Sequence, residues 1–198
     1  MSLNLLDEDI LLWNRFRQGD DVALGKLMQR YFSALYEYGC SFSRRPELVD
    51  DTIQELFFDL WQRRDRLSNV TRVQSYLLVS LRNRLVASLR KPGQWLLRDE
   101  LTEDEVGFEG EFVIESQLVE EDESQTQALQ QLLGQLSKRQ REAIYLRFYQ
   151  NLDNESIADL MRISRPAVSN LISTAITQLR KHWGNIISLF ISAFTYFL

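Results

Sequence analysis

Apolar residues recur at helical spacing along most of the chain. In the segment that Pro46 opens, the i, i+3, i+4, i+7 stripe of an amphipathic helix consists of Ile53, Leu56, Phe57 and Leu60. The same spacing predicts further helices that start near Leu12 and cover residues 22–38, 73–89 and 128–136. Strand-like alternation is scarce, and 8 glycines and 3 prolines leave few breaks. The pattern therefore predicts an all-α protein.

A Pro92-Gly93 break and a shift in charge divide the chain. Residues 92–124 hold 12 acidic residues and one basic residue, a composition that resists compaction. Apolar residues around Phe108 and Phe112 leave room there for a short docked strand or turn. We expect two small helical modules joined by this acidic linker, with the parts 1–91 (first module), 92–124 (linker), 125–183 (second module) and 184–198 (tail).

The tail is strongly apolar. In residues 186–198, 10 of 13 residues are apolar. A membrane-spanning helix needs about 20 such residues, so this segment is too short to cross a bilayer. Left in water it would favour aggregation. We therefore expect that it is covered, either by the protein's own modules or by a partner.

Residues 147–179 have the pattern of a helix-turn-helix. Asp153 can cap a short helix, a break follows at residues 162–164, and a second helix places Val168 and Ala175 on one side. Such a second helix can enter a DNA major groove, although a plain helical hairpin has the same pattern. Ser and Asn side chains can bind base edges and phosphates, and Arg can bind phosphates. The candidate contacts are Arg162, Ser164, Arg165, Ser169, Asn170, Ser173 and Thr174.

A second candidate DNA surface lies in residues 63–91. Eight basic residues stand there against a single acid, Asp65. Beside another DNA-reading element, such a run suits a phosphate backbone. The alternative is a solvated helix face. The run consists of Arg63, Arg64, Arg66, Arg72, Arg82, Arg84, Arg90 and Lys91.

Composition argues against catalysis. One His and the single Cys40 provide no metal cluster, no disulfide framework and no Cys/His dyad, and they suit a reducing cytoplasm. No nucleophile, base and orienting group can be assembled from motifs, so we expect no enzyme activity, no cofactor and no small-molecule substrate. The first residues are acidic where a secretory signal would be basic.

The motifs together identify a family. The run from Asp51 through Gln54, Glu55 and Phe57 to Trp61 resembles the D-x-x-Q-E-x-F-x-x-x-W signature of bacterial sigma factors. Further similar motifs are Gly19-Asp20-x-x-Ala23, Ser75-Tyr76-Leu77 and Leu136-Ser-x-x-Gln140-Arg141-Glu142. The resemblance covers about residues 10–91 and 126–182. Two modules with only a short linker are typical of the extracytoplasmic-function group.

The resemblance implies partners and sites. Core RNA polymerase and promoter DNA would be the partners, with room for an anti-sigma factor. Core polymerase would bind Asp51, Gln54, Glu55 and Asp59. The minus-ten element would contact Arg66, Arg72, Tyr76, Arg82, Asn83, Arg84, Arg90 and Lys91. The helix-turn-helix residues named above would read the minus-thirty-five element.

The chain also departs from the family pattern. Ala87 stands where a carboxylate is common, Arg162 replaces a turn glycine, and the second helix of the helix-turn-helix lacks the usual basic residues. These changes affect the promoter sequence expected, not the fold. Two alternatives remain: a helix-turn-helix regulator that acts without polymerase, and a sigma-like adaptor that has lost promoter reading.

Overall fold

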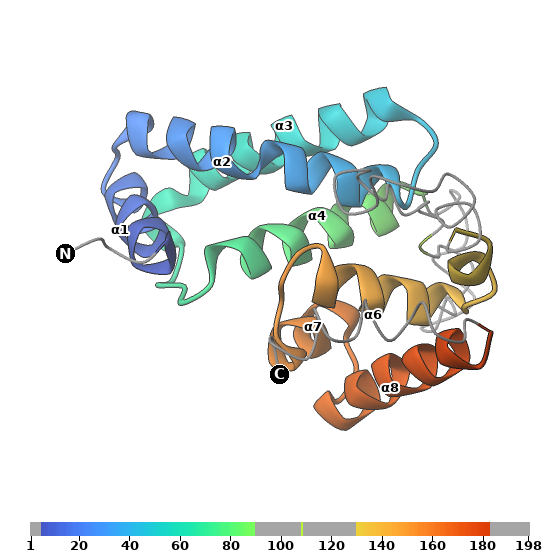
Figure 1. Ribbon diagram of the computed structural model, residues 1–198. Helices are drawn as coiled ribbons and strands as arrows, with labels where there is room; N and C mark the ends of the chain where they lie inside the picture. The colour runs from blue at the N-terminus through green and yellow to red at the C-terminus, as the bar shows by residue number, and fades with distance from the viewer. Residues whose placement is uncertain (1–4, 90–107, 109–129, 183–198) are drawn as a thin grey trace, which may run out of the picture. The chain divides into compact units, whose positions relative to one another are not determined.

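The computed structural model describes residues 5–89, 108 and 130–182 of the 198 residues (Figure 1). The described regular elements are helices, as the apolar spacing predicted. They belong to two compact units, one within residues 1–109 and the other within residues 110–198. Each unit has its own core and is described separately.

The described residues of the N-terminal unit form four α-helices and one short 3₁₀ helix. In chain order these are α1 (Leu5–Arg17), α2 (Asp21–Cys40), α3 (Pro46–Arg63), η1 (Arg64–Arg66) and α4 (Val73–Leu89). Gly19 turns the chain between α1 and α2 with a φ of +96°, which glycine adopts without a steric penalty. The Asp20 carboxylate then accepts a hydrogen bond from the Ala23 backbone N–H at 3.0 Å and caps α2.

The core of this unit is built from the predicted apolar faces. α2 contributes Leu27, Leu35 and Tyr38, and α3 contributes the predicted stripe that begins at Ile53. α2 and α3 approach closely at Gly39, because a Cβ atom there would lie 2.5 Å from the Val49 side chain. Helix α4 begins at Val73 as predicted, is described as far as Leu89, and packs against α1, α2 and α3 together.

Phe108 from the acidic segment joins this core. Its side chain is 2% exposed. The Phe108 ring lies 5.8 Å from the Phe42 ring, edge to face, and 6.4 Å from the Tyr38 ring. The apolar residues of the linker were expected to allow docking, and Phe108 does dock.

The C-terminal unit contains α6 (Lys138–Phe148), α7 (Asn154–Met161) and α8 (Arg165–His182). A capping box begins α6, because Ser137 and Gln140 exchange side-chain to backbone hydrogen bonds. Asp153 caps α7, as predicted. Arg162 ends α7 in the left-handed region, with a φ of 53°.

Within the described residues, no helix is long and apolar enough to span a bilayer. The tail of residues 184–198 lies outside them, so its expected docking stays a prediction.

Candidate functional site

The outer face of α3 carries three of the predicted polymerase-binding residues. Asp51, Gln54 and Glu55 are all exposed on this helix. The opposite face of α3 is formed by four buried residues, Ile53, Leu56, Phe57 and Leu60. The three polar side chains therefore lie outside the core of this unit, and the Gln54 amide donates a hydrogen bond to Asp50 on the same helix at 3.0 Å.

Phe58 extends this outer face. It lies three residues after Glu55, on the same side of the helix, and its side chain is 61% exposed. A large aromatic ring next to carboxylates makes the face mixed in character, apolar as well as acidic. The sequence motif did not single out this position.

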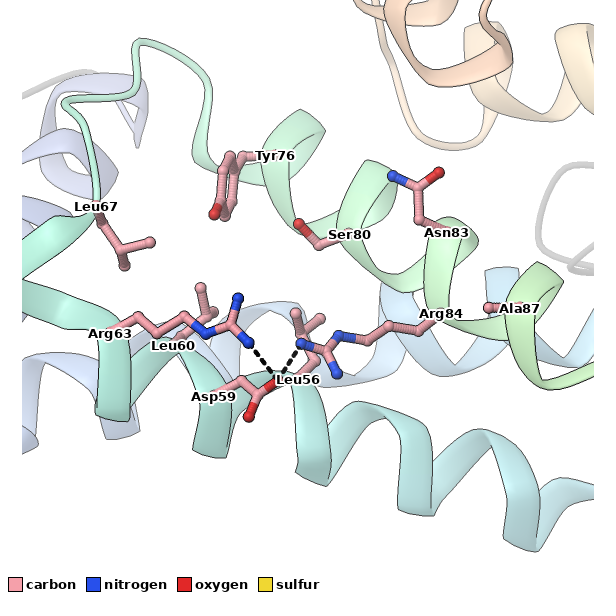
Figure 2. A pocket seen from close by; sticks show the side chains of 10 residues that line it. All are labelled: Leu56, Asp59, Leu60, Arg63, Leu67, Tyr76, Ser80, Asn83, Arg84 and Ala87. Atoms are coloured by element: carbon pink, nitrogen blue, oxygen red, sulfur yellow. Dashed lines mark hydrogen bonds and ion pairs between the residues drawn. The ribbon is translucent and has the colours of Figure 1, made fainter.

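Asp59, the fourth predicted polymerase-binding residue, has a different environment. Its carboxylate accepts a hydrogen bond from Arg84 of α4 at 2.6 Å and lies 3.8 Å from the Arg63 guanidinium (Figure 2). The hydrogen bond from Arg84 is the main reason that the pKa of Asp59 lies below its ordinary value, and the charges of Arg84 and Arg63 lower it further. Asp59 is therefore engaged between α3 and α4.

Asp59 and Arg84 line a cavity of about 360 Å³ between α3, the following loop and α4. Tyr76 and Ser80 face this space from α4, and Leu67 faces it from the loop (Figure 2). Tyr76 and Ser80 are half-exposed residues that line this cavity. The full lining is Leu56, Asp59, Leu60, Arg63, Leu67, Tyr76, Ser80, Asn83, Arg84 and Ala87.

Helix α1 holds the loop at residues 67–72 that borders this cavity. The Trp13 indole N–H donates a hydrogen bond to the Ser68 carbonyl at 3.1 Å. Arg17 donates a second hydrogen bond to the Asn69 side chain. The Trp13 ring also contacts the Tyr76 ring edge to face, with centroids 5.0 Å apart. This supporting role of α1 was not predicted, because the partners are more than 50 residues apart in sequence.

The remaining predicted minus-ten residues are spread more widely. Arg66 is exposed in η1, and Arg72 is half-exposed just before α4. Arg82 is only 5% exposed, and its guanidinium lies 5.8 Å from the centre of the Phe42 ring. A DNA contact by Arg82 would require its side chain to leave the core, and this assignment stays a prediction. Arg90 and Lys91 lie outside the described residues.

Helix α8 presents the predicted DNA-facing side chains on its outer surface. Val168 and Ala175 are fully buried on the opposite side. Ser164 precedes α8, and its hydroxyl accepts a hydrogen bond from the Ala167 backbone N–H, in the first turn of the helix, at 3.3 Å. The exposed residues in and before α8 include all seven candidates: Arg162, Ser164, Arg165, Ser169, Asn170, Ser173 and Thr174.

Two hydrogen bonds shape the outer face of α8. Asn154 at the start of α7 donates to the Ser169 hydroxyl at 3.1 Å, which links the two helices of the helix-turn-helix. The Ser173 hydroxyl donates to the Asn170 carbonyl at 3.1 Å. Positive charge on the exposed side chains is confined to the ends of α8, at Arg162 and Arg165 and at Arg180 and Lys181.

The described residues contain no group of His, Cys, Asp and Glu that could hold a metal ion. The fold and its surfaces define a helical protein with a helix-turn-helix in one unit and a cationic cavity between helices in the other. Two family models match these units: Sigma-70 region 2 over residues 27–95, and Sigma-70, region 4 over residues 126–179.

The chain belongs to the sigma-70 family, in its extracytoplasmic-function group, and acts as a sigma factor in transcription initiation. It is 27% identical over 179 residues to the RNA polymerase sigma factor NccH of Alcaligenes xylosoxydans xylosoxydans. That match covers 86% of this chain and 92% of NccH.

Two solved structures have a similar fold. CnrH in complex with the cytosolic domain of CnrY is 21% identical, with a TM-score of 0.59, and the match covers 88% of this chain and 96% of CnrH. The sigma factor RpoE of Bartonella quintana, in complex with the anti-sigma factor NepR, is 22% identical, with a TM-score of 0.55. That match covers 79% of this chain and 94% of RpoE.

Proposed function

We propose that the outer face of α3 binds the core RNA polymerase and that two further surfaces contact the promoter. Asp51, Gln54 and Glu55 support this assignment because they are exposed together opposite a fully buried stripe. An acidic and amide-bearing face is complementary to a basic partner helix. By the family resemblance, that partner helix would belong to the coiled coil of the largest polymerase subunit.

The test is a double substitution, Gln54→Ala with Glu55→Ala, in the full chain. We expect weaker binding to core polymerase and unchanged helicity, because both side chains are exposed. The matched control is Gln29→Ala with Glu37→Ala, which makes the same chemical change at two exposed positions of α2. Wild-type affinity in the first variant, or equal losses in both, would contradict the assignment.

The second surface is the cavity between α3 and α4, which would engage the minus-ten element. Strand opening leaves bases unstacked and phosphates displaced, and these suit a pocket that holds an aromatic ring and cations. Tyr76, Asn83 and Arg84 line one side of this cavity. Arg66 and Arg72 lie on the chain that leads from α3 to α4, where they could contact the phosphates.

The third surface is the outer face of α8, which would read the minus-thirty-five element. Its side chains are mainly hydroxyls and amides, which bind base edges but add little phosphate attraction. Such a helix binds DNA weakly alone. Linking it to a second module and to the polymerase provides the missing affinity through a high effective concentration.

This assignment places the chain in the cytoplasm with the polymerase, as a regulator without catalytic activity of its own. Run-off transcription with core polymerase separates it from the two alternatives. A sigma factor initiates at a specific start site, whereas an adaptor that binds polymerase does not. A helix-turn-helix regulator would bind its DNA site without polymerase.

An anti-sigma factor is a further proposed partner. CnrH and RpoE, whose folds resemble this chain, were each solved with a bound protein, CnrY and NepR respectively. The corresponding experiment is co-purification of the tagged full chain from its own cells. A protein that co-purifies with the chain and blocks run-off transcription when it is added back would support the proposal. The absence of any such co-purifying protein would contradict it.

A further inference from the structure

Phe108 occupies an unusual place, because it is an aromatic residue from a strongly acidic segment that lies inside a folded core. Its side chain is among the largest that are fully buried in the described chain. Its ring contacts Phe42 edge to face at 5.8 Å, and Phe42 in turn contacts Tyr38 at 5.1 Å. Acidic residues surround Phe108 in sequence, with Glu105 before it and Glu109 directly after it.

We propose that Phe108 fastens the acidic segment to the N-terminal unit. The chain that spans between the two modules would then begin after Phe108 and not at the end of α4. This inference builds on the proposed function, since it concerns how the two modules act together. The Phe108 ring lies against Tyr38 and Phe42, and the Arg82 guanidinium of α4 lies over the Phe42 ring; we call Tyr38, Phe42 and Arg82 the aromatic receptacle.

The aromatic receptacle supplies the driving force for fastening. Edge-to-face ring contacts are favourable beyond the burial of apolar area alone. The buried guanidinium of Arg82 lies 5.8 Å from the Phe42 ring centre, on α4, so the receptacle joins α2 to α4. The acidic residues of this segment favour water, so docking depends on apolar residues such as Phe108.

Opposite charges flank the aromatic contact. Arg44 and Arg45 follow Phe42 closely and are both exposed. On the other side, Glu105, Glu109 and Glu111 are within three residues of Phe108. The sequence therefore puts charges of opposite sign next to the two rings that meet.

Fastening shortens the span between the modules. About 40 residues separate the end of α4 at Leu89 from the helical residue Gln130, but only about 20 separate Phe108 from it. The greatest distance that the chain can bridge falls from about 140 Å to about 75 Å. For a free chain, the effective concentration of one module near the other falls as about the −3/2 power of length, so release would lower it about threefold.

Proteolysis of the full chain by a glutamyl endopeptidase tests the fastening directly. Cleavage after Glu105, Glu109 and Glu111 reports on the chain near Phe108, and cleavage after Glu120, Glu121 and Glu123 is the internal reference. In Phe108→Ala we expect the near sites to be cut at least tenfold faster relative to the reference sites. The matched control is Phe112→Ala, which removes the same ring from the same acidic segment and should leave the ratio unchanged.

An unchanged ratio in Phe108→Ala, with helicity retained, would overturn the fastening. If that variant does not fold, Phe108→Leu keeps the test open, because a smaller apolar side chain should raise the ratio by an intermediate amount. The span is tested by the affinity of the chain, bound to core polymerase, for a promoter that carries both elements. This affinity should weaken about threefold in Phe108→Ala, and an equal affinity would overturn the effect on the span. The proteolysis result does not depend on sigma activity, so it can fail or succeed separately from the Gln54 and Glu55 test.

Discussion

The Arg84 guanidinium donates a hydrogen bond to the Asp59 carboxylate at 2.6 Å and so joins α4 to α3 across the cavity. Arg84 was predicted to contact DNA and Asp59 to contact polymerase, but in the free protein they bind each other. A phosphate that enters the cavity would compete with Asp59 for the same guanidinium. The Asp59–Arg84 pair therefore links α3, which carries the proposed polymerase-binding face, to α4, which lines the proposed minus-ten cavity.

This pair predicts a pH dependence of stability. The pKa of Asp59 is lowered in the folded state, chiefly by the hydrogen bond from Arg84. The ionised Asp59 carboxylate therefore contributes its full stabilisation of the folded state above the unfolded-state pKa of an Asp, about 3.9. This stabilisation is lost as the pH falls through the lower pKa of Asp59 in the folded state. We expect Asp59→Asn to be less stable than the wild type at neutral pH, with the difference shrinking below about pH 4.

Urea denaturation of both proteins between pH 7 and pH 3 measures this effect. The control is Asp65→Asn, which makes the same change at a carboxylate that is 76% exposed and 3.8 Å from Arg64. A difference between wild type and Asp59→Asn that stays constant across this pH range would contradict the prediction.

The exposed ring of Phe58 is expected to contribute to polymerase binding. Buried aromatic anchors beside charged groups commonly dominate protein interfaces, with losses of 2 kcal/mol or more on truncation, or roughly 30-fold in affinity. Phe58→Ala should therefore weaken core binding by at least about tenfold. Val22→Ala on α2 is a closely matched control, because Val22 is 60% exposed and Phe58 is 61% exposed. Equal affinities of the two variants would show that Phe58 is an ordinary surface residue.

Arg162 carries a backbone cost that glycine would remove. Its φ of 53° lies in the left-handed region, which disfavours residues with a Cβ by roughly 1–2 kcal/mol. Part of the gain is offset by the greater freedom of glycine in the unfolded chain. We expect Arg162→Gly to stabilise α7 and α8 by about 0.5–1 kcal/mol, measured by amide hydrogen exchange. Arg162→Ala keeps the Cβ and should show no such gain, so a similar gain in both variants would point to the guanidinium instead.

Asn170 is expected to read one promoter position. A good base contact provides roughly 1–3 kcal/mol of discrimination, so Asn170→Ala should relax the preference at that position by about 5-fold or more. Thr177→Ala is the control, because the Thr177 hydroxyl already donates to the Ser173 carbonyl at 2.8 Å within the same helix. Transcription from a library of upstream elements measures both variants. A uniform loss across all sequences would indicate phosphate contact by Asn170 and not base reading.

The local features of the fold were predictable from the sequence because they depend on neighbouring residues. The caps at Asp153 and Ser137 and the stripe on α3 are all of this kind. The surroundings of α4 were harder to predict. This helix packs against three others, so no single apolar stripe defines its buried side. Tyr76 lines a cavity beside α3, and Arg82 is buried where a DNA-facing position was expected.

The candidate surfaces also contain features that follow from local periodicity and features that depend on distant contacts. Exposure on α8 follows from helical periodicity, and the predicted residues there are all exposed. The pairing of Asp59 with Arg84 depends on where α3 and α4 cross, and the burial of Phe108 depends on a receptacle from distant segments. Neither leaves a periodic signal in the sequence.

The attachment of α1 to α2 has a consequence for the loop at residues 67–72. Arg30 of α2 binds Glu8 at 2.8 Å and also binds Asp9, and Tyr31 donates a hydrogen bond to the buried Asp9 carboxylate. Because Trp13 on α1 holds the Ser68 carbonyl, these ionic contacts indirectly support the loop. High salt screens the exposed part of this attachment. The order of a loop that borders the minus-ten cavity should therefore respond to the ionic strength of the cell.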